Sequence, residues 1–187
     1  MYMCEYLKNF IVVGGTGRNV GKTTLVEQLI KKFKDQYTVN TVKTSMLLPG
    51  EDYLHGQHTL AGPGSFFIRE EKEGIGKKDS QRFLKAGAKR SFFISLGDGA
   101  AELAMNELLS GFDEKSLIIM ESNVLAYWKK PAVFIMVVDE NRHLPKYARL
   151  LENADVVVKA RDAKAFQYIV NQLNAELDDK GRVRVGK

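Results

Sequence analysis

The residues with the clearest chemical meaning form one glycine-rich run near the start of the chain, GTGRNVGKTT. The apolar run Phe10–Val13 comes just before it, and an amphipathic stretch that begins at Leu25 comes directly after it. A strand, a glycine-rich turn and a helix that opens with Gly-Lys-Thr-Thr are typical of a phosphate-binding loop, where backbone N–H groups and the helix N-terminus surround the phosphates. We therefore expect GTP or ATP to bind through Gly15, Thr16, Gly17, Arg18, Asn19, Val20, Gly21, Lys22, Thr23 and Thr24.

Two residues of this run have specific roles in the expected chemistry. Lys22 would reach the β- and γ-phosphates as a point charge, and the hydroxyl of Thr23 would ligate Mg²⁺. The usual spacing is G-x-x-x-x-G-K-[ST], but position 16 is threonine and the preceding glycine is Gly15, so this loop is one residue longer. A glycine turn that only joins a strand to a helix is the alternative, and the position of Gly-Lys-Thr-Thr favours phosphate binding.

Two acidic residues are candidates to complete the site. Glu121 ends the apolar run Leu117–Met120, and a carboxylate at the end of a buried strand lies at the ligand-binding edge of an open α/β sheet. There it would hold Mg²⁺ together with Thr23 or orient a hydrolytic water, unless it only caps a loop. Asp79 or Ser80 would N-cap a helix, and the same position also suits the handling of an anion or a metal. The candidate catalytic residues are Lys22, Glu121 and Asp79.

Other polar residues allow two interpretations each. Lys43 follows the second predicted strand and would serve either a phosphate or the solvated surface. Arg18 would neutralise charge across a dimer, although a solvent-facing side chain is the simpler expectation. His55 and His58 could present two imidazoles to a metal, but paired histidines in a glycine-rich loop are usually ordinary loop residues. Trp128 would stack on a ring of a ligand or pack at a loop edge.

Strands and helices alternate along the chain, which predicts an α/β fold with a mainly parallel, doubly wound sheet and helices on both faces. The predicted strands are 10–13, 37–43, 90–95, 117–120, 133–138 and 156–159. The predicted helices are 21–33, 100–109, 144–152 and 162–177, with Asp162 as an N-cap, and the last ten residues are expected to fray. We expect a single domain over 1–187, with an irregular insertion at about 44–78 that includes a small hairpin near 65–70.

Size and composition exclude several classes of protein. The chain has 187 residues, a formal net charge of +5 and one cysteine, Cys4, which excludes a disulfide framework and suits a reducing compartment. No apolar run approaches the length of a membrane span and the N-terminus lacks a signal-peptide core, so the cytoplasm is the expected location. The basic residues are spread out, which makes a polyanionic small molecule a better expected partner than nucleic acid.

Three segments together resemble the molybdopterin-guanine dinucleotide biosynthesis protein B family, a class of P-loop NTPases. They are GTGRNVGKTT, the segment KKDSQRFLKAGA at 77–88, and the strand-end acid in LIIMES at 117–122. The longer loop also resembles that of dethiobiotin synthetase. The chain departs from the family after the second strand, where Lys43-Thr44-Ser45-Met46 replaces Lys-His, and after Glu121, where Ser122 replaces glycine.

The resemblance implies a GTP-binding, weakly hydrolysing, dimeric accessory protein of molybdenum-cofactor maturation, with a molybdopterin-type or other small molecule as second ligand. Two other functions remain open on the sequence. One is a small-molecule kinase or ATP-dependent ligase, in which the insertion at 44–78 would form the acceptor pocket. The other is a non-enzymatic switch, in which the bound nucleotide sets the affinity for a partner.

Overall fold

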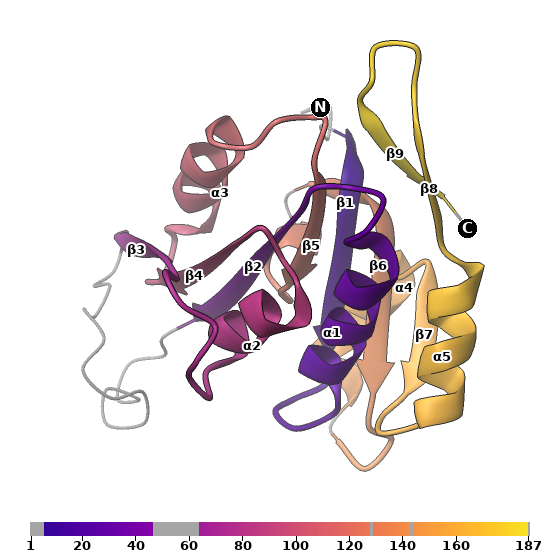
Figure 1. Cartoon of the computed structure of the whole chain (residues 1–187). Coiled ribbons are helices and arrows are strands. Elements are labelled where there is room, and N and C mark those ends of the chain that lie inside the picture. The colour runs from indigo at the N-terminus through magenta and orange to yellow at the C-terminus, as the bar shows by residue number, and fades with distance from the viewer. Residues whose placement is uncertain (1–5, 47–63, 128, 143, 187) are drawn as a thin grey trace.

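A seven-stranded sheet with helices on both faces forms the centre of the molecule (Figure 1). The computed structural model describes residues 6–46, 64–127, 129–142 and 144–186. The strands of this sheet are β1 (Tyr6–Gly15), β2 (Val39–Met46), β3 (Phe66–Glu70), β4 (Arg90–Leu96), β5 (Leu117–Glu121), β6 (Lys130–Val138) and β7 (Val156–Lys159). Their order is β3-β4-β2-β5-β1-β6-β7, and every neighbouring pair is parallel except β3 and β4. The predicted α/β fold with a mainly parallel sheet is therefore confirmed.

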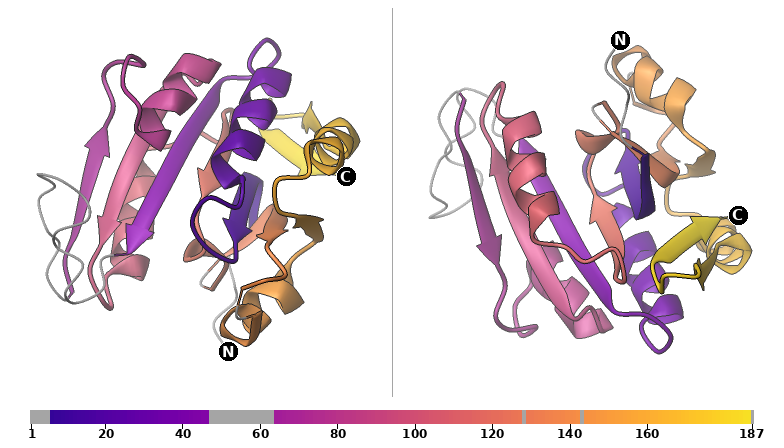
Figure 2. Two further views of the ribbon diagram at one scale, coloured as in Figure 1. Left: turned by 90° about the horizontal axis from the view of Figure 1, so that it is seen from below. Right: turned by 90° about the horizontal axis from the view of Figure 1, so that it is seen from above.

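The helices divide between the two faces of the sheet, as the end-on views of Figure 2 show. One face is covered by α1 (Lys22–Phe33), α2 (Asp79–Ala86) and α5 (Ala163–Gln172). The other is covered by α3 (Ala101–Ser110), α4 (Ala148–Asn153) and the short 3-10 turn η1 (Leu125–Tyr127). Because the central strands are buried from both sides, β5 and most of β6 are continuous apolar runs rather than alternating ones.

Alternating side chains of β1 connect the two halves of the core. Ile11 and Val13 pack among α1 and α5, whereas Phe10 and Val12 pack toward α3. On α1 the predicted core positions Leu25, Leu29, Ile30 and Phe33 are all buried, at the spacing of an amphipathic helix. This packing holds α1 against the sheet, and residues 16–21 connect the end of β1 to the start of the helix.

Several predicted boundaries were wrong for reasons of tertiary structure. The second strand runs over Val39–Met46 rather than 37–43, so Thr44 and Ser45 lie within it rather than after it. The predicted hairpin near 65–70 is instead the edge strand β3, antiparallel to β4. The predicted helix at 144–152 begins as the 3-10 turn η2 (Leu144–Tyr147) before α4. The remainder of the predicted insertion, 47–63, lies outside the described residues.

The end of the chain also differs from the prediction. The helix predicted over 162–177 stops at Gln172, and the tail expected to fray forms a hairpin of β8 (Asn174–Leu177) and β9 (Val183–Gly186). Contacts with distant segments hold it, because the buried residue Val183 donates its N–H to the carbonyl of Glu114 at 2.8 Å. The Tyr37 hydroxyl donates to the carbonyl of Ala175, and Lys32 donates to the carbonyl of Leu173.

No helix within the described residues is long and apolar enough to cross a membrane.

Candidate functional site

The loop between β1 and α1 contains three residues with positive φ, Gly17, Asn19 and Gly21. Gly21, the N-cap of α1, has a φ of 107°, a conformation that residues with a side chain rarely adopt. A Cβ at this position would also lie 2.9 Å from the ring of Phe166. At Gly15 a Cβ would lie 2.9 Å from the carbonyl oxygen of Val137. The glycines at 15 and 21 are therefore required by close packing and, at Gly21, by backbone conformation.

Neighbouring segments hold both sides of this loop. The buried Thr16 accepts a hydrogen bond from the N–H of Asp139 at 2.8 Å, and its own N–H reaches the carbonyl of Val137. On the other side, Arg161 donates from its side chain to the carbonyl of Asn19 at 3.1 Å. The loop is thus attached to the ends of β6 and β7. Within the run, the residues that line the adjoining cavity are Gly17, Arg18, Asn19, Gly21, Lys22, Thr23 and Thr24.

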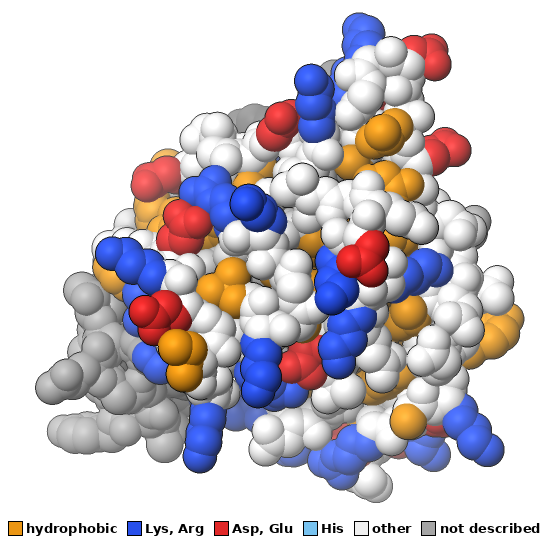
Figure 3. Space-filling model, viewed as in Figure 1, with side chains coloured by type: hydrophobic (Ala, Val, Ile, Leu, Met, Phe, Trp, Pro, Cys, Tyr) orange, Lys and Arg blue, Asp and Glu red, His pale blue; other side chains and the backbone are white. Residues whose placement is uncertain are grey.

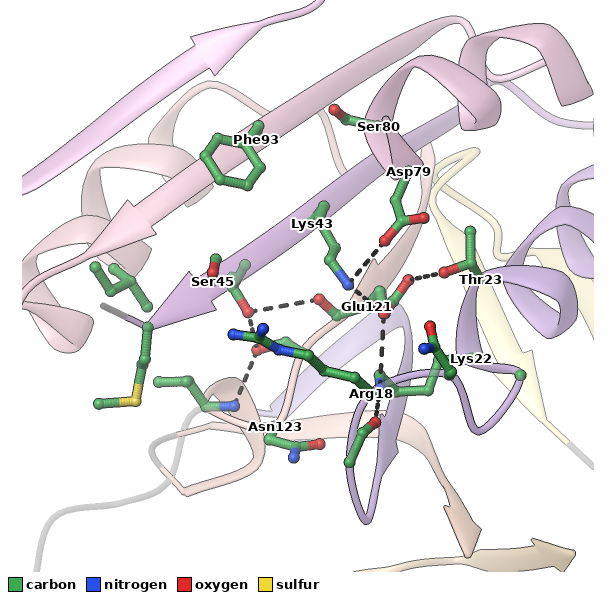
Figure 4. A pocket seen from close by; sticks show the side chains of 18 of the residues that line it. Arg18, Lys22, Thr23, Lys43, Ser45, Asp79, Ser80, Phe93, Glu121 and Asn123 are labelled. Atoms are coloured by element: carbon green, nitrogen blue, oxygen red, sulfur yellow. Dashed lines mark hydrogen bonds and ion pairs between the residues drawn. The ribbon is translucent and has the colours of Figure 1, made fainter. Parts of the chain in front are cut away.

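Glu121, at the end of β5, is the centre of the site (Figure 4). Its side chain is only 2% exposed, and its Oε2 accepts a hydrogen bond from the hydroxyl of Thr23 at 2.9 Å. Its Oε1 forms an ion pair with Lys43 and lies 4.0 Å from Nζ of Lys22. The structure therefore brings together Thr23 and Glu121, the two residues predicted to hold Mg²⁺, although they are 98 positions apart.

Asp79 reaches the same cluster through Lys43. Its carboxylate lies 3.2 Å from Nζ of Lys43, which bridges it to Glu121. The predicted capping role is wrong for both candidates, because α2 begins at Asp79 with Lys78 as its N-cap residue. Ser80 instead donates its hydroxyl to Glu71 at 2.7 Å. Asp79 is consequently available as the second acid of the site.

Lys43 was open to two interpretations, and the structure supports a role in the site. It lies in β2 opposite Glu121 in β5, with the two residues in register. Its side chain is 19% exposed and pairs with two carboxylates, which is not the environment of a solvated surface lysine.

Burial lowers the pKa of Lys22. The low-dielectric surroundings disfavour the ammonium form, the charge of Lys43 acts in the same direction, and the carboxylate of Glu121 opposes both. Lys22 also donates to the carbonyl of Gly17 inside its own loop. Its ammonium group is thus held at the loop, where an anion would stabilise its charged form.

Asn123 clamps the start of the loop, a role that the sequence did not reveal. Its side-chain oxygen accepts from the N–H of Gly15 and its amide donates to the carbonyl of the same residue, each at 2.8 Å. The neighbouring Ser122 accepts a hydrogen bond from the hydroxyl of Thr44 at 2.8 Å. The polar turn that follows Glu121 therefore joins β1, β2 and β5 at their carboxyl ends.

A cavity of about 1510 Å³ opens beside these groups, at the carboxyl ends of the central strands. Among the described residues that line it, nine are basic and three are acidic, which favours an anionic ligand. Figure 3 shows Lys and Arg side chains gathered at the lower end of the molecule, toward which β1 runs in Figure 1. The acidic members are Asp79, Asp98 and Glu121.

Other candidate residues lie elsewhere. Asp162 accepts from the N–H of Ala165 at 2.9 Å, which confirms its predicted role as the N-cap of α5. His55, His58 and Trp128 lie outside the described residues. Within the described part of the chain, no three or more His, Cys, Asp or Glu side chains come together in a group that could hold a metal ion. Any Mg²⁺ site would therefore depend on Thr23, Glu121 and the ligand's own oxygens.

Comparison with protein families, curated proteins and solved structures finds no match for this chain. The site must accordingly be interpreted from its own chemistry.

Proposed function

We propose that the chain is a P-loop NTPase, a Mg²⁺-dependent protein that binds GTP or ATP and hydrolyses it slowly. The observation that carries this proposal is the meeting of Lys22 and Thr23 from the loop with the buried Glu121 from β5. A cation, a hydroxyl and a carboxylate at the start of a helix are the groups that a triphosphate with its metal requires. Thr23 and Glu121 would hold Mg²⁺, which supplies charge neutralisation at the phosphates when bound.

The residues of the chain have distinct tasks in this proposal. The backbone N–H groups of residues 17–24 bind the phosphates, since those of Gly15 and Thr16 donate to Asn123 and Val137. Lys22 neutralises charge that develops on the transferred group. Glu121 and Asp79 are both held by Lys43 at the end of the sheet. These two carboxylates are the candidates to orient a hydrolytic water, and their ion pairs with Lys43 would have to rearrange before either one does so.

The proposed biological role depends on the resemblance to the molybdopterin-guanine dinucleotide biosynthesis protein B family. Three features carry that resemblance: the loop, the segment 77–88 and the strand-end acid. On that basis the protein serves as a homodimeric accessory in molybdenum-cofactor biosynthesis, with GTP as the preferred nucleotide. The α/β fold and the position of the cavity outside the carboxyl ends of the strands are compatible with this class of protein.

A second candidate function is a small-molecule kinase or ligase. The cavity favours it, because about 1510 Å³ exceeds the roughly 300–1,000 Å³ of a typical small-molecule site. Steady hydrolysis without any added acceptor would favour the NTPase, whereas turnover that requires an acceptor would favour the kinase or ligase. Negligible turnover with tight binding would favour a nucleotide switch.

A titration of fluorescent GTP and ATP analogues, with and without Mg²⁺, tests the proposal. We expect Mg²⁺ to strengthen binding and Lys22→Ala to weaken it about tenfold to a hundredfold, because one charge-assisted contact is lost. Lys31→Ala is the matched control, since Lys31 is an exposed lysine of the same helix. Equal affinities for the Lys22→Ala protein and the control would contradict the proposal.

A further inference from the structure

Three side chains form a row across the sheet beside the loop 15–24. Phe93 in β4 is in register with Lys43 in β2 on one side and with Arg69 in β3 on the other. Residues in register on neighbouring strands point to the same face of a sheet, and Figure 4 shows Phe93 and Lys43 on one side of the strands. The guanidinium of Arg69 lies 5.5 Å from the centre of the Phe93 ring.

The first turn of α2 marks the edge of this row. Ser91, the next residue toward the start of β4 on the same face, is buried under the helix, and its hydroxyl donates to the carbonyl of Ser80 at 2.7 Å. Beyond the first turn of α2, the row of Lys43, Phe93 and Arg69 lines the cavity. The same cavity is lined by Lys22 and Thr23, so the row and the loop share one continuous space.

The row has the properties of a site for an anion. Its ends are Lys43, which pairs with Glu121 and Asp79, and Arg69, which pairs with Glu71, and its centre is an aromatic ring. The surplus of positive charge in the cavity is completed by further basic side chains, among them Lys77 and Lys78.

We infer that Lys43, Phe93 and Arg69 form a second ligand site, which takes a small molecule with a carboxylate or phosphate group and an apolar or planar body. The inference rests on the proposed function in one respect only, namely that a nucleotide occupies the neighbouring loop 15–24. Lys43 pairs with Glu121 and Asp79, so it touches the groups proposed for nucleotide chemistry and the second site alike. A ligand bound here would lie next to the phosphate end of the nucleotide.

Calorimetric titration with phenyl phosphate tests the second site, since this probe combines a dianion with a ring. The protein is first saturated with Mg²⁺ and ADP, so that the loop 15–24 does not take up the probe. We expect one further equivalent to bind, and Arg69→Met to weaken that binding about tenfold or more. Benzyl alcohol, which has the ring without the charge, should not compete.

The sheet supplies a matched control on its opposite face. Arg90 pairs with Glu70 at 2.7 Å and lies 4.7 Å from the ring of Phe92, much as Arg69 pairs with Glu71 beside Phe93. Arg90 does not line the cavity, so Arg90→Met should bind phenyl phosphate as the wild-type protein does. Equal loss of binding in both variants, or no binding in the loaded wild-type protein, would overturn the inference.

Two further measurements separate this inference from the proposed function. If the protein does not bind ADP, phenyl phosphate is titrated into the Lys22→Ala protein without nucleotide. Binding in this protein that Arg69→Met still weakens supports the second site alone, without the proposed function. The backbone amide chemical shifts of Arg69 and Phe93 in the wild-type protein give a readout that needs no variant. Shifts confined to the loop 15–24 would count against the site.

Discussion

The two halves of the cavity are built in different ways. On one side, residues of the loop 15–24 line the cavity from one short segment, and the shape of this loop depends on glycine conformations and on the clamp of Asn123. On the other side, Lys43, Phe93 and Arg69 come from three strands and meet only through sheet register. Glu121 joins the halves, because it accepts from Thr23 on one side and pairs with Lys43 on the other.

This difference suits the two halves of the cavity to different tasks, the loop to binding any phosphate and the row to selecting one ligand. A loop of consecutive backbone N–H groups recognises phosphate whatever it is attached to, since the donors belong to the main chain. Side chains brought together by strand register can change one at a time without disturbing the loop. We therefore expect nucleotide binding to depend on the loop and the choice of second ligand to depend on the row.

Removal of Glu121 should have the largest effect, because it breaks both halves at once. Glu121→Ala leaves Lys43 and Lys22 without their buried partner, and we expect the free energy of unfolding to fall by about 3–5 kcal/mol. The strengthening of nucleotide binding by Mg²⁺ should also disappear. Urea unfolding and nucleotide titration measure the two effects, with the exposed Glu107→Ala as control. Unchanged unfolding would show that Glu121 does not join the halves.

Asn123→Ala should affect the loop half alone. The N–H and carbonyl of Gly15 both lose a partner, which should lower the free energy of unfolding by about 1–3 kcal/mol and weaken nucleotide binding. Binding of phenyl phosphate to the row should stay as in the wild-type protein. If Asn123→Ala weakens the binding of nucleotide and of phenyl phosphate equally, the two halves of the cavity are not independent. Asn106→Ala, at an exposed position of α3, is the control.

Ser80→Ala should have the smallest effect and be confined to the row. Burial acts to raise the pKa of Glu71, but hydrogen bonds from Ser80 and Arg69 outweigh it and hold the pKa below its ordinary value. A carboxylate with a lowered pKa adds stability above its ordinary pKa and loses it as the pH falls through the folded-state pKa. Loss of the Ser80 hydroxyl should therefore raise this pKa and reduce that contribution.

Urea unfolding at two pH values tests this expectation. The Ser80→Ala protein should be less stable than the wild-type protein by about 1 kcal/mol at about pH 7, and the difference should shrink as the pH falls through the folded-state pKa of Glu71. Ser110→Ala, which removes an exposed hydroxyl on α3, should show no such dependence on pH. If the difference in the free energy of unfolding between the two proteins stays constant with pH, the contribution of Ser80 does not depend on the charge of Glu71.

The same contrast explains what could be predicted from the sequence. The loop lies in ten consecutive residues, and Glu121 ends an apolar run, so both patterns are local. The row of Lys43, Phe93 and Arg69 depends on the pairing of β3 with β4, and the residues of β3 were predicted as a hairpin of their own. The clamp by Asn123 joins positions 108 residues apart, which no local pattern encodes.

The errors at the end of the chain have a related cause. The pattern of α5 was extended to Leu177, although Leu173 is buried and extended in conformation. Its carbonyl accepts a hydrogen bond from Lys32 of α1, a contact that exists only in the folded protein. Asp79 was placed correctly near the helix start, but its carboxylate pairs with Lys43 rather than capping the helix.

The hairpin of β8 and β9 has a practical consequence. It packs against β1 and β6, and the N–H of Val183 donates to the carbonyl of Glu114 in the turn before β5, at the opposite end of the sheet from the loop 15–24 (Figure 1). Its turn contains Gly181, with a φ of 70° and open space around its Cα. A fluorescent label or a surface tether attached at this turn would leave the cavity open, so immobilised protein should report binding at both proposed sites.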